Sequence, residues 1–123
     1  MTNEFDWGVD FVPHNRWKEQ PPKTHIQEFE DDARQIYNEL LNTLVTKQID
    51  YGPFNVWHSP GGPVNGLMVR MSDKMERLKN LLYKSIDPNH ESISDSFADL
   101  ANYAVIAIMV ERGIWEKHAK KSK

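Results

Sequence analysis

Two stretches in which apolar residues recur at helical spacing lie on either side of a turn at residues 87–89. They constrain the fold of this chain more than any other feature. Before the turn, from about residue 64 to 84, apolar residues recur every three or four positions, as on the buried face of a helix. They are Leu67, Met71, Met75, Leu78 and Leu82. After the turn, a helix capped by Asn89 is predicted from about residue 90 to 112, ending at Gly113. Its predicted core face comprises Ile93, Phe97, Leu100, Ala101, Ala104 and Ile108.

A third long helix is predicted ahead of this pair. Thr24 and Gln27 form a Thr-x-x-Gln capping box, and the helix can run to about Gln48. Its apolar stripe is Phe29, Ala33, Ile36, Leu40 and Leu44. We therefore predict an all-α bundle of about three long helices, with its helical core at residues 24–113. A chain of 123 residues is long enough for one domain and too short to expect two.

The two ends of the chain are expected to be irregular. Residues 1–23 contain three prolines and a glycine among several large apolar side chains. They predict an extended aromatic arm, which either covers the chain's own bundle or reaches over a partner subunit. Residues 114–123 are expected to form a tail in which Trp115 packs and the basic end frays.

Residues 50–65 contain three prolines and three glycines, so neither a regular helix nor a regular strand is expected there. Connections longer than about 12 to 15 residues tend to be functional or disordered. The aromatic residues of this loop are Tyr51, Phe54 and Trp57. They suit stacking against a flat ligand such as a base, with Asn55 or His58 supplying hydrogen bonds. Equally, the rings could simply close the open end of a bundle.

Charged side chains flank the apolar stripes of the helix pair. At about 100° per residue, Arg70, Asp73, Lys74 and Arg77 share one side of the first helix. The second helix presents Glu91, Asp95, Asp99 and Asn102. Two carboxylates four residues apart on a half-buried helix need a cation to remain ionised. That cation is either a side chain of the other helix, in an ion-pair network without chemistry, or a hard metal ion such as Mg²⁺ or Mn²⁺.

Composition narrows the functional classes. A net charge of −3 lacks the basic excess of a nucleic-acid binder, so no direct nucleic-acid binding is expected. The absence of cysteine excludes disulfides, a thiol nucleophile and a cysteine zinc site. No run approaches the roughly 18 to 20 apolar residues that span a bilayer, and the acidic start is unlike a signal peptide. We expect a cytoplasmic protein without membrane contact.

Three segments together resemble a known family: KQIDYGPFN, GLMVRMSDKMERLKNLL and ESISDSFADLANYAVIA. They look like the small phage and bacterial proteins of the nucleotide modification associated domain type 1 family, related to the all-α MazG-like nucleotide pyrophosphohydrolases. The similarity covers about residues 47–108. It implies a helical bundle that forms homodimers or homotetramers. The expected activity is Mg²⁺-dependent cleavage of nucleoside triphosphates between the α and β phosphates. The protein would act in the host cytoplasm if it is phage-encoded.

The resemblance also implies roles for individual residues. The metal ligands would be Asp73, Glu91, Asp95 and Asp99, and the catalytic residues Asp95, Asp99 and Lys74. Phosphates would be bound by Arg70, Lys74 and Arg77. The nucleoside side would be lined by Lys47, Tyr51, Asn55, Trp57 and Asn102. The usual Glu-Glu-x-x-Glu cluster is reduced here to Asp73 and Glu76, and Ser96 stands where a further acid is typical.

We therefore expect a metal-dependent (deoxy)nucleoside triphosphate pyrophosphohydrolase. The incomplete acidic motif keeps open a second hypothesis, a non-hydrolytic nucleotide-binding or sequestering module or a subunit of a phage nucleotide-modification system. A third hypothesis is an interaction protein whose charged stripes are only ion pairs.

Overall fold

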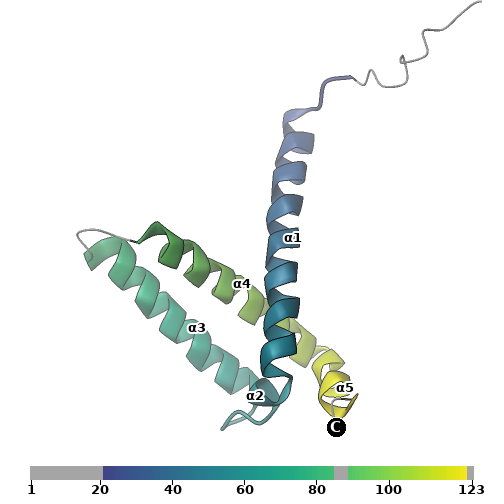
Figure 1. Cartoon of the computed structure of the whole chain (residues 1–123), viewed down its shortest axis with the longest axis vertical. Coiled ribbons are helices and arrows are strands. Elements are labelled where there is room, and N and C mark those ends of the chain that lie inside the picture. The colour runs from purple at the N-terminus through teal and green to yellow at the C-terminus, as the bar shows by residue number, and fades with distance from the viewer. Residues whose placement is uncertain (1–20, 85–88, 122–123) are drawn as a thin grey trace, which may run out of the picture. The chain divides into compact units, whose positions relative to one another are not determined.

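The structure is a computed structural model that describes residues 21–84 and 89–121 of the chain. Every regular element within these ranges is a helix, which confirms the predicted all-α fold (Figure 1). The predicted N-terminal arm falls, up to residue 20, outside the described residues. The chain divides into two compact units, Met1–Ala33 and Arg34–Lys123, with the boundary inside the first helix, and the core and pockets described below belong to the second unit.

The first helix, α1, spans His25–Tyr51. Its capping box is confirmed: the Gln27 amide donates to Thr24 Oγ1 at 3.2 Å, and the Thr24 amide donates to Gln27 Oε1 at 2.8 Å. The helix runs three residues beyond the predicted end and stops where Gly52 takes a φ of 69°. Such a φ is readily reached only without a Cβ atom, so this glycine fixes the end of α1.

The segment at residues 50–65 is more ordered than predicted. Besides the end of α1, it contains a single helical turn, α2, at Phe54–Trp57. The next helix, α3, begins at Pro63, where proline is favoured because the first helical amides need no partner. The prediction of no regular helix over residues 50–65 is therefore wrong, since its prolines and glycines lie between helical turns or, like Pro63, at the first position of a helix.

Helices α3 (Pro63–Lys79) and α4 (His90–Glu111) lie side by side as an antiparallel pair (Figure 1). A π-helical turn, η2, continues α3 over Asn80–Lys84. The predicted cap of α4 is confirmed, because Asn89 accepts a hydrogen bond from the Ser92 amide at 3.1 Å. The helix also ends beside Gly113 as predicted, where φ is 74°.

A small apolar core lies where α2, α3, α4 and the last helix meet. It comprises Val56, Leu67, Ile106 and Trp115. The last helix, α5, spans Ile114–Lys121, so the prediction of a frayed tail is wrong for these residues. Trp115 is only 3% exposed and donates its indole N–H to the Pro53 carbonyl at 3.2 Å, which ties α5 to the segment before α2.

The predicted core face of α4 is wrong at two of its largest residues. Phe97 and Ile108 are 53% and 51% exposed, whereas Ser96, Asn102 and Ile106 are buried. Besides Ile106, the inner face carries a hydrogen bond to α1 and ion pairs to α1 and α3, which apolar spacing alone does not reveal. By length and composition α4 could also cross a bilayer, but core helices of soluble proteins meet the same criterion.

The other predicted stripes are buried only in part. Leu67 and Leu78 of α3 are buried as predicted, but Met75 and Leu82 are exposed. No residue of α1, all of which the structure describes, is buried, and Phe29 and Ile36 of its predicted stripe are exposed. An apolar stripe marks the face that needs covering, but it does not say whether the same chain supplies the cover.

Candidate functional site

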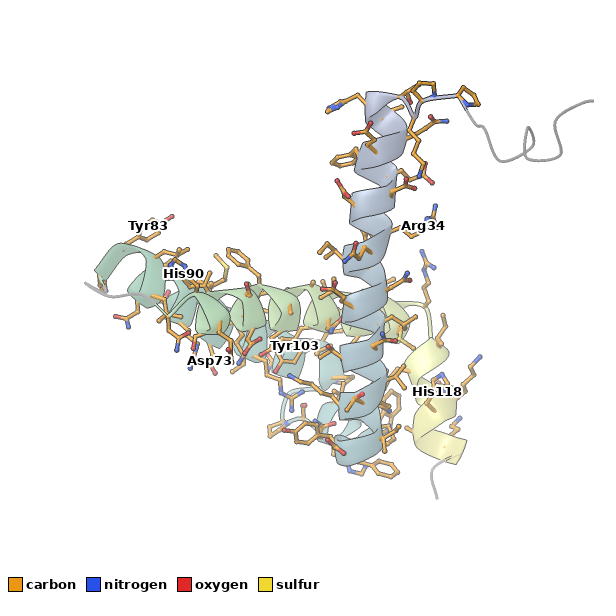
Figure 2. All side chains as sticks on the ribbon, turned by 45° about the horizontal axis from the view of Figure 1, so that its top comes forward. Arg34, Asp73, Tyr83, His90, Tyr103 and His118 are labelled. Carbon is orange, nitrogen blue, oxygen red and sulfur yellow. The ribbon has the colours of Figure 1, made fainter. Side chains whose placement is uncertain are left out.

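Helices α1, α3, α4 and α5, together with α2 and the loop before it, line a pocket of about 320 Å³, here called the aromatic pocket. Its lining residues on α1 are spaced for one helical face, as are those on α4. Helix α1 provides Leu44, Lys47, Gln48 and Tyr51; α3 provides Arg70 and Lys74; α4 provides Asp99, Asn102, Tyr103 and Ile106. The loop, α2 and α5 add Gly52, Asn55, Val56 and Trp115. Figure 2 shows Tyr103 on α4 where this helix passes α1.

An ion triad of Lys47, Asp99 and Lys74 joins α1, α4 and α3. The two lysine Nζ atoms lie 2.8 and 2.9 Å from the two different carboxylate oxygens of Asp99. The Asp99 side chain is only 15% exposed, and the lysines are more open. A mostly buried carboxylate is thus satisfied on both oxygens by cations that still reach solvent.

The triad shifts two ionisation equilibria. Burial by itself would raise the pKa of Asp99, but the hydrogen bonds and charges of Lys47 and Lys74 outweigh it and hold that pKa below its ordinary value. The hydrogen bond to Asp99 in turn raises the pKa of Lys47. Both shifts favour the charged forms of Asp99 and Lys47.

The part of the aromatic pocket away from the triad is largely apolar. Val56, Ile106 and Trp115 of the core line it. Arg70 donates to the backbone carbonyl of Asn55 at 2.8 Å, which attaches α3 to the loop. The pocket therefore combines a cationic region with an apolar and aromatic region, a combination that suits a phosphorylated ligand with a flat ring.

A second pocket of about 390 Å³, here called the Arg77 pocket, shares the three triad residues. Its other lining residues are Thr43, Arg77, Ser92, Asp95, Ser96 and Ala98. A third, shallower pocket on α3 brings Asp73 beside Arg70, Lys74, Arg77 and Tyr103. The triad thus lies at the junction of the aromatic pocket and the Arg77 pocket.

The structure brings most of the predicted site residues together. Seven line the aromatic pocket: Lys47, Tyr51, Asn55, Arg70, Lys74, Asp99 and Asn102. Arg77 and Asp95 are added in the Arg77 pocket. Asp73 lines only the shallow pocket, Glu91 is exposed at the start of α4, and Trp57 packs against the apolar core instead.

The predicted set of four metal ligands is not assembled. Within residues 21–84 and 89–121, no three histidine or acidic side chains gather closely enough to hold a metal ion. Both oxygens of Asp99 are paired with lysines, and only Asp95 shares a pocket with it among the predicted ligands. Two carboxylates do not fit an ion held by the protein alone. A Mg²⁺ ion that also takes phosphate oxygens and waters needs only one or two protein carboxylates.

The lining residues that sequence reasoning did not assign to the site include Gln48, Tyr103 and Trp115. The first two were within reach of the sequence: Gln48 lies four residues after Leu44, and Tyr103 lies four residues after Asp99, so each continues a predicted stripe. Trp115 was expected only to pack, and nothing local in the sequence connects it with the loop that it contacts.

Comparison with known families gives one match. The family model described as nucleotide modification associated domain 1 matches residues 47–110, just over half of the chain. This range begins at Lys47 and includes the whole of α3 and nearly all of α4. No curated protein and no solved structure matches the chain.

Proposed function

The chain belongs to the nucleotide modification associated domain 1 family, and from this premise we propose that it binds a nucleoside phosphate across the aromatic and Arg77 pockets. The observation that carries the proposal is the position of the triad. Two solvent-reaching lysines stand at the junction of a pocket with an apolar aromatic region and a pocket with a further arginine. A nucleotide has the same order of parts, a flat base at one end and phosphates at the other.

The chain's own groups have distinct tasks in this proposal. Lys47 and Lys74 donate to phosphate oxygens, and Asp99 holds their ammonium groups in place before the ligand arrives. Arg77 extends the cationic surface along α3, one turn after Lys74. The base lies against the apolar region at Ile106 and Trp115, where stacking and burial favour it.

A second candidate is hydrolysis of a nucleoside triphosphate to the monophosphate and pyrophosphate. One observation favours it: Asp95 and Asp99 line the same pocket as three cations, Lys47, Lys74 and Arg77. A Mg²⁺ ion arriving with the triphosphate would be held by these two acids and would supply charge neutralisation and activation of water. The side chains of Lys74 and Arg77 would bind the departing pyrophosphate.

We further propose that the domain acts as a homodimer or homotetramer. Only six apolar residues are buried among those described, and none of them belongs to α1. Helices of this kind gain most of their stability from packing an apolar face, and residues 21–84 and 89–121 bury no residue of α1. A second copy is the one partner that is always present in equal amount, and obligate dimers often lack a stable monomer.

The test of nucleotide binding uses Lys74→Met. Wild-type protein is titrated calorimetrically with the four deoxynucleoside triphosphates, with Mg²⁺ and with EDTA, and pyrophosphate release is measured in parallel. We expect Lys74→Met to weaken binding on the order of 10-fold, since a charge-assisted hydrogen bond contributes about 1.5–3 kcal/mol.

The matched control is Lys79→Met on the same helix, because Lys79 is exposed, pairs with Glu76 and lines none of the three pockets. It should bind like wild type. Binding without pyrophosphate release would reject the hydrolytic candidate and leave the binding proposal standing. If no nucleotide binds, or if both lysine variants bind equally well, the binding proposal is wrong.

A further inference from the structure

Asn102 is a buried polar residue in the lining of the aromatic pocket. It lies on the inner face of α4 and is only 7% exposed. Its Nδ2 donates to the Leu40 carbonyl of α1 at 3.1 Å. Within the described part of the chain, no group pairs with its Oδ1. A buried polar atom without a partner is uncommon in proteins and calls for an explanation.

The orientation of the Asn102 amide follows from its partner. A carbonyl oxygen can only accept a hydrogen bond, so the NH₂ group must face Leu40, and the amide cannot be turned over without losing that bond. The oxygen is thereby fixed away from Leu40. Since the side chain lines the aromatic pocket, Oδ1 is the atom available to a ligand there.

The position of Asn102 along α4 indicates which part of a ligand it meets. Asp99 of the triad precedes it by three residues, and Ile106 of the apolar region follows it by four. At 1.5 Å per residue these separations are about 4.5 and 6 Å along the helix axis. Asn102 therefore lies between the region proposed for phosphates and the region proposed for the base.

We infer that Asn102 is a specificity-determining residue, whose amide oxygen accepts a hydrogen bond from an N–H or O–H group of a bound nucleoside. The inference rests on the proposed nucleotide binding and adds a requirement to it: the ligand must carry a donor beyond its phosphates. A base amine or imide and a sugar 3′-hydroxyl both have this chemistry. A ligand consisting of phosphates alone does not.

The test combines a protein variant with ligand analogues. Asn102→Leu removes the acceptor at similar size. We expect it to weaken deoxynucleoside triphosphate binding about 5- to 100-fold, the usual range when a buried partner is left unpaired. Inorganic tripolyphosphate should bind within about 2-fold of wild type. The matched control is Asn65→Leu, which loses a similar bond to a backbone carbonyl, Pro60 O at 3.2 Å, outside the pocket. It should change neither affinity.

Ligand analogues test the same contact in wild-type protein and so do not depend on the folding of a variant. Dideoxynucleotides lack the 3′-hydroxyl, and nucleotides with a dimethylated base amine or an N-methylated base imide lack that base donor. One of these two sets should bind wild type about as weakly as Asn102→Leu binds the parent nucleotide, and Asn102→Leu should not distinguish the analogue from the parent.

Three results would contradict the inference. The first is an equal loss of tripolyphosphate and nucleotide binding in Asn102→Leu, which would indicate a structural role only. The second is wild-type protein that binds both analogue sets as tightly as the parent. The third is wild-type protein that binds no nucleotide at all, which would also reject the proposed function, whereas the first two would leave that function in place.

Discussion

The two faces of α4 differ in a way that reverses the usual rule. The inner face carries Ser96, Asp99 and Asn102 and is mostly buried, whereas the outer face carries Phe97 and Ile108, each about half exposed. Polar side chains point into the chain and large apolar side chains point out of it. The inner face is therefore specified by particular bonds, to Leu40, Lys47 and Lys74, as well as by the burial of Ile106 in the apolar core.

The two faces of α4 also differ in the kind of surface that can cover them. The inner face can be satisfied only by exact partners, because a buried carboxylate or amide without its partner is costly. The outer face can be satisfied by any apolar surface of suitable shape. We therefore connect the inner face with ligand binding and the outer face with assembly.

The largest effect is expected from the apolar residue of the inner face. Ile106→Ala should lower the free energy of unfolding by about 2–5 kcal/mol, because it opens a cavity against Trp115 and Leu67. Val105→Ala, at the neighbouring and exposed position, should cost less than about 1 kcal/mol. Urea unfolding of both variants measures the difference. Equal losses of unfolding free energy would mean that the two faces are buried to the same extent, which would contradict the difference described between them.

A charge on the outer face should affect assembly rather than the ligand pocket. Phe97→Glu is expected to weaken self-association on the order of 10- to 100-fold, because a charge would be buried against an apolar surface. Sedimentation velocity over a range of concentrations measures this, with Asn80→Glu as the control that adds the same charge at an exposed site on η2.

The outcome of this experiment also identifies what covers the outer face. Wild-type protein that remains monomeric at every concentration would contradict the proposed homo-oligomer. Co-sedimentation of such a monomer with lipid vesicles would then assign the face to a membrane surface instead.

The smallest effect concerns the ion triad and pH. The folded pKa of Asp99 lies below the ordinary value of about 3.9, so its stabilisation is complete above about pH 4 and is lost as the pH falls through the lower folded value. The folded pKa of Lys47 lies above about 10.4, so its contribution is complete below that pH and is lost as the pH rises through the higher value.

The variant Asp99→Asn isolates this contribution. The difference in unfolding free energy from wild type should be on the order of 1 kcal/mol and constant between about pH 5 and 9. It should shrink below about pH 4, where the wild-type carboxylate becomes neutral like the amide. A difference that instead grows as the pH falls would show that the triad does not stabilise the inner face.

Much of the local structure was predictable because its causes are local. The capping boxes and caps at Thr24 and Asn89 and the stop at Gly113 depend on residues within a few positions, and all three are confirmed. The stripes of charge on α3 and α4 follow from helical spacing alone. The same spacing correctly places Arg70 and Lys74 beside Asp99 and Asn102 in one pocket.

Other features depend on residues far apart in the sequence and could not be predicted in this way. Lys47 pairs with Asp99 across 52 positions, and Trp115 bonds to Pro53 across 62. Helical spacing shows which residues share a face of a helix, but it does not show which face contacts the neighbouring helix. This is why the stripe of Phe97 and Ile108 was assigned to the core and is found outside it.

The sequence by itself determined the three long helices, most of their ends and the residues that share each face, because hydrogen bonding and side-chain spacing act within a few residues. Only the tertiary structure decided which face of α4 turns inward and that Asp99 is held by two lysines rather than grouped with other acids. Those choices depend on which distant groups can satisfy a buried charge or amide, and that information is a property of the packed helices rather than of any one of them.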